Sequence, residues 1–227
     1  MPILANVLVA AKGGKLSITA TDLEVELVAT SEVDVQRGGE ITIPGRKLLD
    51  ICRALPEGTE ITLTQEGERM LVRARKSRFT LTTLPAAEFP TVEEINAEQT
   101  LQLPQKDFKR LLDKTHFSMA QQDVRYYLNG LLLETSAKML RAVATDGHRL
   151  ALCEVELANG GKAGQQVIVP RKGVLELQRI LGNEDQLLEV SIGSNHLRVQ
   201  IGEIRFTSKL IDGRFPEYSR VIPATPP

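Results

Sequence analysis

The chain has 227 residues, 42% of them hydrophobic and 25% charged, and its formal net charge is −1. This composition is ordinary for a globular protein, and the length fits two domains of the usual size. No apolar run approaches the roughly 18 residues of a membrane-spanning helix, and the N-terminus lacks the regions of a signal peptide. The two cysteines, Cys52 and Cys153, form no CxxC motif. This favours buried, reduced thiols in a cytoplasmic protein over a disulfide framework or a zinc site.

Residues 1–90 predict a succession of short strands with one helix, because apolar or alternating runs are separated by turn residues. Strands are expected at residues 3–10, 16–20, 23–27, 61–64, 70–74 and 78–84. Between them, ITIPGRKLLDICRAL at 41–55 predicts a short strand, a proline and an amphipathic helix. Its apolar residues recur at helical spacing, and proline is tolerated in the first turn of a helix.

Residues 91–222 predict the same elements, after a linker at 85–98. Strands are expected at residues 99–103, 128–134, 139–144, 149–155, 187–192, 196–201 and 204–210. One helix is expected from 105 to about 118, and another after Pro170. We therefore expect a first domain at 1–90, a second at 91–222, and at 223–227 the start of a linker to a third domain.

The strand-proline-helix pattern occurs three times, around Pro44, Pro104 and Pro170. The same distance separates Pro44 from Pro170 and Phe89-Pro90 from Phe215-Pro216. This longer repeat predicts an α+β fold of two tandem domains, each made of two βαβββ halves with largely antiparallel sheets. Compared with the second copy, the first lacks about 25 residues at its start, so we expect an internal start.

The three predicted helices concentrate basic charge, since in each of them Lys and Arg outnumber Asp and Glu by two. The basic residues are Arg46, Lys47, Arg53, Lys106, Lys109, Arg110, Lys114, Arg171, Lys172 and Arg179. One such helix is most simply explained as a solvated face. Three equivalent helices in a chain of net charge −1 favour contact with a polyanion.

The segment Thr145-Asp146-Gly147-His148-Arg149 places a carboxylate two residues from an imidazole, a spacing that invites a general-base interpretation. However, Asp-Gly between alternating runs is a strong hairpin signal, and no nucleophile in a recognisable context accompanies it. The pattern favours a recognition surface, with apolar contacts from Leu150 and Leu152. Isolated His116 and His196 do not support a metal site, and neither Gly-Gly-Lys segment has the spacing of a phosphate loop.

A polar loop carries Gln121-Gln122 and then Arg125-Tyr126-Tyr127. Tyr and Gln commonly bind phosphate or stack on unpaired bases, which would make this loop a nucleic-acid contact. Alternatively, one tyrosine packs under a strand edge. The residues alone leave both interpretations open.

Several long motifs resemble the bacterial DNA polymerase III β subunit family, the sliding clamps. They are FPTV at 89–92, QDVRYYLNG at 122–130, ATDGHRLAL at 144–152, VPRKGVLEL at 169–177 and FTSKLIDGRFPEY at 206–218. The resemblance implies a non-catalytic processivity factor without cofactors: a ring of two protomers, each of three domains. In this ring, basic helices would face duplex DNA and sheets would lie outside. It also implies sequence-independent DNA binding, since contacts to phosphates carry no sequence information.

The resemblance further implies a cleft for Gln-Leu-x-Leu-Phe-type peptides of the DNA polymerase III α subunit, the clamp loader, other polymerases and repair proteins. By position, its residues would be Leu128, Thr145, Gly147, His148, Arg149, Leu150, Pro216, Arg220 and Val221. Gln122, Arg125, Tyr126 and Tyr127 match positions that face DNA. The third domain of the family has no counterpart here, so we expect this chain alone neither to close a ring nor to bind peptide at full strength. A peptide-binding adaptor without DNA function is the alternative; a nucleic-acid enzyme is disfavoured because no metal-ligand carboxylate cluster is evident.

Overall fold

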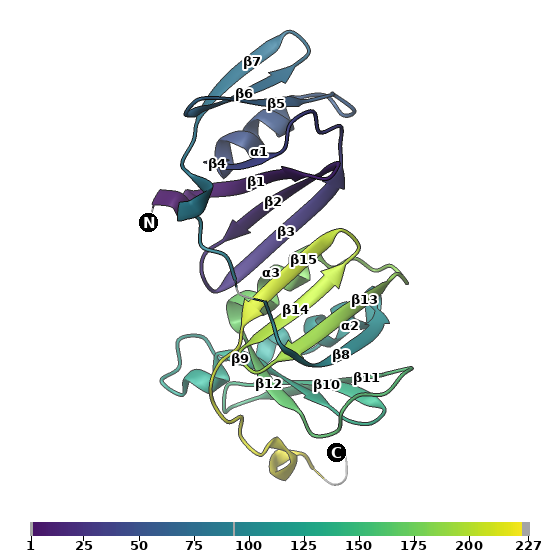
Figure 1. Ribbon diagram of the computed structural model, residues 1–227. Helices are drawn as coiled ribbons and strands as arrows, with labels where there is room; N and C mark the ends of the chain where they lie inside the picture. The colour runs from purple at the N-terminus through teal and green to yellow at the C-terminus, as the bar shows by residue number, and fades with distance from the viewer. Residues whose placement is uncertain (1, 93, 224–227) are drawn as a thin grey trace. The chain divides into compact units, whose positions relative to one another are not determined.

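The computed structural model describes residues 2–92 and 94–223, which form two compact units (Figure 1). The first unit comprises residues 1–94 with 202–206, and the second comprises 95–201 with 207–227. Within the described residues, no helix is both long enough and apolar enough to cross a membrane.

The first unit contains two antiparallel sheets and one α-helix. Its elements are η1 (Pro2–Ala5), β1 (Asn6–Lys12), β2 (Lys15–Thr21), β3 (Val25–Glu32), β4 (Gly39–Pro44), α1 (Gly45–Ala54), β5 (Thr62–Glu66), β6 (Arg69–Ala74), β7 (Ser77–Thr82) and η2 (Ala86–Glu88). The strands pair in the orders β4-β1-β2-β3 and β5-β6-β7. Ile43, Ile51 and Val72 belong to one buried cluster, so both sheets and the helix share a core.

The second unit contains two sheets and two α-helices. Its elements are β8 (Ala97–Pro104), α2 (Gln105–Asp113), η3 (His116–Ser118), η4 (Tyr126–Leu128), β9 (Gly130–Thr135), β10 (Met139–Thr145), β11 (Leu150–Glu156), β12 (Gln166–Pro170), α3 (Arg171–Ile180), β13 (Leu187–Gly193), β14 (His196–Ile201), β15 (Ile204–Lys209) and η5 (Tyr218–Val221). The strand orders are β11-β10-β9-β12 and β15-β14-β13-β8, although residues 204–206 at the start of β15 are grouped with the first unit. The predicted α+β fold with βαβββ halves is confirmed.

The three α-helices each begin directly after a proline, at Pro44, Pro104 and Pro170. Proline suits this position because its fixed φ turns the strand into the helix and its missing N–H would have no helical partner. On α2, Phe108 and Leu111 are fully buried, and on α3 so is Val174. The amphipathic faces expected from the spacing are confirmed on these two helices.

The strand expected at 23–27 runs instead from Val25 to Glu32. Three further boundaries are wrong where a 3₁₀ turn interrupts an apolar pattern. The strand expected at 3–10 begins at Asn6, and the strand expected at 128–134 begins at Gly130. The helix expected to reach about 118 ends at Asp113. There the Thr115 hydroxyl donates to the Leu111 carbonyl oxygen at 2.6 Å, and a 3₁₀ turn follows. Local hydrogen bonds therefore override the continuing periodicity.

The expectation of two buried thiols is also wrong: Cys52 is exposed and Cys153 is half-buried. Both are free cysteines. Cys52 lies eight residues after Pro44; at the same distance from their prolines, Leu112 of α2 is buried and Gln178 of α3 is half-buried. In the second unit α2 packs against α3, whereas the first unit has one α-helix among its described residues. The described part of the first unit therefore places no second α-helix beside the Cys52 side of α1.

Candidate peptide cleft and nucleic-acid surface

The β10–β11 hairpin is shaped by two side chains that bond to the turn itself. The Thr145 hydroxyl donates to the Arg149 carbonyl oxygen at 2.7 Å and accepts from the Gly147 amide at 3.1 Å. Asp146 Oδ1 accepts the amides of His148 and Arg149 at 2.9 and 3.0 Å. The turn therefore holds the side chains of His148 and Arg149 on the surface, where both are exposed.

Both oxygens of the Asp146 carboxylate bond to groups of this turn. Hydrogen bonds from the amides of His148 and Arg149, and then from the Arg149 side chain, lower the pKa of Asp146 to about 2. Its other oxygen lies 3.1 Å from Arg149 Nε. A carboxylate that is held ionised by its own turn is a weak proton acceptor. This geometry supports a structural role for Asp146 rather than general-base catalysis.

Arg125 reaches the same hairpin from the preceding loop. Its Nη2 donates to Asp123 Oδ2 at 2.8 Å and approaches the Asp146 carbonyl oxygen at 3.4 Å. The hydrogen bonds from the Arg125 side chain and amide lower the pKa of Asp123 to about 2. A Cβ on Gly147 would lie 3.1 Å from Arg125 Nη1. Gly147 thus allows the guanidinium to lie against the turn.

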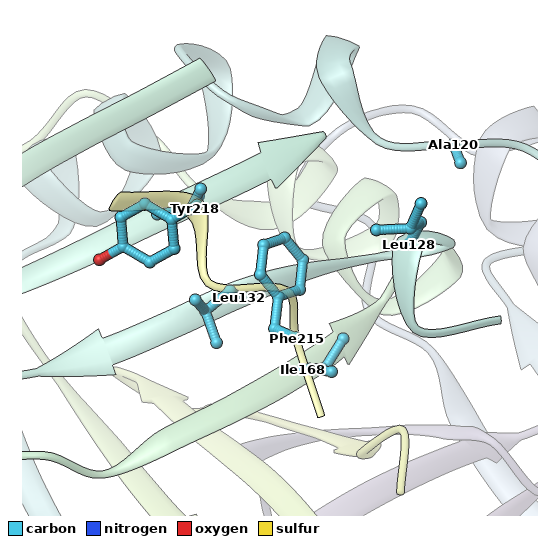
Figure 2. Packing of buried hydrophobic residues seen from close by; sticks show 7 residues of the cluster. Ala120, Leu128, Leu132, Ile168, Phe215 and Tyr218 are labelled. Carbon is cyan, nitrogen blue, oxygen red and sulfur yellow. The ribbon is translucent and has the colours of Figure 1, made fainter. Parts of the chain in front are cut away.

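An apolar cluster lies beneath the predicted cleft. Figure 2 shows Leu128, Leu132, Ile168, Phe215 and Tyr218 packed together from η4, β9, β12 and the C-terminal segment. Val143 and Ala120 are also buried members of this cluster. Leu150 and Tyr127 pack against the cluster. The cluster brings the hairpin strands and the segment after Phe215 to the same face of the sheet.

The predicted cleft residues divide into a floor and a rim. Leu128 is buried, at 1% exposure, and Leu150 and Thr145 are half-buried. The exposed residues are Gly147, His148, Arg149, Pro216, Arg220 and Val221. Val221 is 69% exposed although it is apolar. An apolar floor with polar and apolar groups around it suits recognition of an extended peptide.

A hollow of about 350 Å³ lies beside the hairpin. Its lining comprises Phe117, Met119, Ala120, Gln121, Asp123, Asp146, His148, Arg149 and Arg171. The Arg149 guanidinium lies 6.0 Å from the centre of the Phe117 ring, which is 50% exposed. Two predicted cleft residues and the first residue of α3 therefore border one depression.

The predicted DNA-facing helices expose most of their basic side chains, but several of them are paired. Ion pairs join Arg46 to Asp50 at 3.3 Å, Lys109 to Asp113 at 2.8 Å, Arg179 to Glu176 at 2.8 Å, and Lys106 to Asp185. Arg110 donates to the Glu154 carbonyl oxygen at 3.5 Å. The Asp185 hydrogen bond raises the pKa of Lys106. Within residues 2–92 and 94–223, Lys47, Arg53 and Arg171 have no carboxylate partner within 4.0 Å, so their charges remain available.

The two tyrosines of the tyrosine loop lie in different surroundings. Tyr126 is 56% exposed, whereas Tyr127 is half-buried and packs against the apolar cluster. Their rings meet edge to face with centroids 5.7 Å apart. Gln122 is exposed and has a positive φ of 55°. Tyr127 supports the loop from below, and Tyr126 and Gln122 are available at the surface.

Two groups of polar residues in this region were not predicted. Asn129 accepts the Asp123 amide and donates to the Asp123 carbonyl oxygen, both at 2.9 Å, and so closes the tyrosine loop. The recurrence of Asn6 as Asn129 in the two copies was the available signal. Arg141 on β10 binds Glu134 and Glu154. Its position in an alternating strand resembles an ordinary solvent-facing residue and carries no signal of its own.

Comparison with known proteins identifies the family. The model for the DNA polymerase III beta subunit, N-terminal domain, matches residues 1–93, and that for its central domain matches residues 102–217. The chain belongs to the DNA polymerase III beta subunit family. Among its relatives, the Escherichia coli K12 beta sliding clamp is 54% identical over 227 residues, covering 100% of this chain and 62% of the relative.

Solved structures of beta subunits have the same fold. A crystal structure of the Pseudomonas aeruginosa subunit has a TM-score of 0.96 at 51% identity, over 99% of this chain and 62% of that one. The Caulobacter crescentus beta subunit has a TM-score of 0.93 at 38% identity, over 99% and 63%. The chain thus spans about three-fifths of the length of the relatives that it matches.

Proposed function

We propose that this chain is part of a processivity factor that surrounds duplex DNA and tethers a replicative polymerase without catalysing a reaction. The observation that carries the proposal is the recurrence of one basic helix, after a proline, at α1, α2 and α3 in a member of the beta subunit family. We place its working compartment in the cytoplasm. We assign residues 1–90 to a first clamp domain and 91–222 to a second; apart from Pro223, the linker expected at 223–227 lies outside the described residues.

The basic helices suit a ring that must move along its DNA. Contacts to phosphate carry no sequence information and attract any duplex. Exposed Lys and Arg side chains exchange between phosphates, because surface ion pairs are weak and screened by salt. Processivity would then come from enclosure in a homodimeric ring of the full-length protein rather than from tight binding.

Partner proteins would use the cleft around the apolar cluster. Linear peptides of the polymerase, clamp loader and repair proteins would place apolar side chains over Leu128 and Leu150, and backbone groups beside the hairpin. The exposed apolar side chain of Val221 and the neighbouring charge of Arg220 would complete this surface. One relative, the Pseudomonas aeruginosa sliding clamp, has been solved bound to griselimycin, which makes that compound a competitor to test against this cleft.

Salt dependence tests the DNA function. The full-length protein is titrated with labelled duplex at several salt concentrations, and log K is expected to fall linearly with log salt, by about 0.9 for each phosphate contacted. Peptide binding that persists in a protein without affinity for DNA, even at low salt, would support the adaptor alternative instead.

A second titration tests the cleft. A labelled Gln-Leu-x-Leu-Phe peptide is titrated against the full-length protein and against His148→Ala. Saturable binding that the substitution weakens is the expected result. Equal binding by both proteins would show that His148 and its hairpin are not part of the cleft. The 227-residue chain alone is expected to bind more weakly and to sediment as a monomer; a stable dimer at micromolar concentration would contradict this second expectation.

A further inference from the structure

A row of polar side chains crosses the β11-β10-β9-β12 sheet in register. Arg141 on β10 lies directly opposite Glu154 on β11 and Glu134 on β9, and Glu134 lies opposite Gln166 on β12. Directly opposite residues are the nearest cross-strand neighbours on one face of a sheet. Arg141 Nε donates to Glu154 Oε1 at 2.6 Å, Arg141 Nη1 to Glu134 Oε2 at 3.2 Å, and Gln166 Nε2 to Glu134 Oε1 at 2.7 Å.

The side chain of Tyr218, from the C-terminal segment, contacts this row through its hydroxyl group. Arg141 Nη1 donates to the Tyr218 hydroxyl oxygen at 2.6 Å, and the hydroxyl donates to Glu134 Oε2. The Arg141 guanidinium also lies 5.9 Å from the centre of the Tyr218 ring. The ring itself is buried in the apolar cluster with Leu132 and Phe215, as Figure 2 shows. One side chain thus has an apolar body on the cluster and a polar tip between two charged residues.

The segment that Tyr218 belongs to has few other attachments. The last backbone hydrogen bond to the sheet is from the Ile211 amide to the Ile168 carbonyl oxygen, at 2.9 Å. Among described residues, no backbone hydrogen bond joins 212–223 to the rest of the chain; the one bond there, from Arg220 to Glu217, is internal. Phe215 and Tyr218 are the two buried residues of this stretch. Side chains rather than backbone therefore hold it.

The two anchors constrain the segment in different ways. Burial of the Phe215 ring is favourable but non-directional, so it attaches the segment without setting its orientation. The Tyr218 hydroxyl has a charged donor on one side and a charged acceptor on the other, and such charge-assisted hydrogen bonds are strong and directional. Glu134 remains ionised here: burial alone would raise its pKa, but the hydrogen bonds from Tyr218, Gln166 and Arg141 lower it.

We propose that Arg141 and Glu134 are positioning residues of the peptide cleft, acting through the Tyr218 hydroxyl to hold η5 over the sheet. Pro216, Arg220 and Val221 lie within three residues of Tyr218 and are all exposed, so the place of Tyr218 sets the place of that side of the cleft. The ligand class is an extended, largely apolar peptide. This inference rests on the proposed function of the cleft.

The test uses Tyr218→Phe and Glu134→Gln in the full-length protein, with fluorescence polarisation of a labelled Gln-Leu-x-Leu-Phe peptide at 25 °C. Each substitution is expected to raise the Kd about fivefold, roughly 1 kcal/mol at 1.4 kcal/mol per tenfold change. The double variant is expected to be little worse than either single variant, because both remove the same contact. Arg141→Lys removes the forked geometry of the guanidinium. Its matched control is Arg73→Lys, because Arg73 is an exposed arginine on β6 of the first unit.

Hydrogen exchange of the Arg220 amide, which donates to the Glu217 carbonyl oxygen, gives a second measurement that needs no peptide. Faster exchange in Tyr218→Phe and Glu134→Gln, with unchanged exchange in Arg73→Lys, would support the positioning role. A lower melting temperature with unchanged exchange and unchanged Kd would overturn it, because the row would then stabilise the sheet alone. If the wild-type protein binds no peptide, the proposed cleft fails, whereas exchange still decides whether the row holds η5.

Discussion

The β2–β3 hairpin of the first unit and the β10–β11 hairpin of the second are the same turn built twice. In the first, the Thr21 hydroxyl donates to the Val25 carbonyl oxygen at 2.9 Å, and Asp22 Oδ1 accepts two amides at 3.0 and 2.9 Å. Thr145 and Asp146 make the corresponding bonds in the second. The Thr-Asp pair of each copy therefore makes the same set of bonds within its turn.

The two hairpins differ in the residue after the aspartate. Leu23 has a φ of 78° and Gly147 a φ of 88°, so both occupy the left-handed region. Because a leucine adopts it in the first unit, this turn does not by itself require glycine. A Cβ at 147 would approach the Arg125 guanidinium to 3.1 Å. The glycine in the second unit therefore avoids both the cost of a left-handed side chain and a close approach to Arg125.

The helices show the same contrast between a shared pattern and different surroundings. Ile51, Leu111 and Leu177 occupy equivalent positions and are all buried. One residue further along, Leu112 is buried, at 1% exposure, Gln178 is half-buried and Cys52 is exposed. The proline and the apolar spacing set where a helix forms, while the number of packing partners sets how much of it is buried.

The largest effect is expected from truncating the side chain of Leu112 in the second unit, compared with that of Cys52 in the first. Leu112→Ala should lower the free energy of unfolding of the second unit by about 2–5 kcal/mol, because it removes buried methyl groups and leaves a cavity. Cys52→Ala should change that of the first unit by less than about 0.5 kcal/mol. Urea unfolding followed by pulsed hydrogen exchange reports the two units separately. Equal losses would contradict the contrast in burial.

The next-largest effect is expected from reciprocal substitutions in the two hairpins, at the residue after the aspartate. Gly147→Leu should lower the free energy of unfolding by about 1–2 kcal/mol, the usual cost of a left-handed non-glycine residue. It should also weaken peptide binding, because the new side chain displaces Arg125. Leu23→Gly should change stability by less than about 1 kcal/mol, since relief of strain offsets the added entropy of the unfolded chain. Unchanged peptide binding by Gly147→Leu would leave Arg125 without a role.

A smaller effect on the salt dependence of DNA binding is expected to distinguish basic residues without a carboxylate partner from those in ion pairs. In the full-length protein, Lys47→Gln and Arg53→Gln should each reduce the slope of log K against log salt by about 0.9, provided that each contacts one phosphate. Lys109→Gln should reduce it less, since the Lys109 ammonium already lies 2.8 Å from Asp113. DNA titrations at four or more salt concentrations measure the slope. A larger effect of Lys109→Gln would mean that DNA displaces Asp113.

The smallest effect is the acid titration of Asp146. Its pKa of about 2 in the folded protein lies below the ordinary value of 3.8. A depressed folded-state pKa contributes stability above the ordinary value, and this contribution is lost as the pH falls from about 4 through about 2. NMR titration of the side-chain carboxyl should give a midpoint near 2. In Asp146→Asn, which retains an acceptor oxygen, this part of the acid dependence should disappear while the turn persists.

Much of the fold could be predicted because its signals are local. Pro44, Pro104 and Pro170 each precede a helix, and the Asp146-Gly147 pair predicts the hairpin that is found. Boundaries were less predictable, since the bond from the Thr115 hydroxyl to the Leu111 carbonyl oxygen ends α2 before its apolar pattern stops. The Arg141 row could not be predicted: Tyr218 lies 77 residues away in the chain, and no periodicity links them.

By itself, the sequence determined the strand-proline-helix repeats, the two tandem domains and the Asp146-Gly147 hairpin, because backbone geometry and hydrophobic spacing act over a few residues. Only the tertiary structure decided that Cys52 is exposed, that Gly147 accommodates Arg125, and that Tyr218 ends between Arg141 and Glu134. Burial, close approach and charge-assisted hydrogen bonding all depend on which distant segments meet. The spacing of residues along one chain cannot specify those meetings.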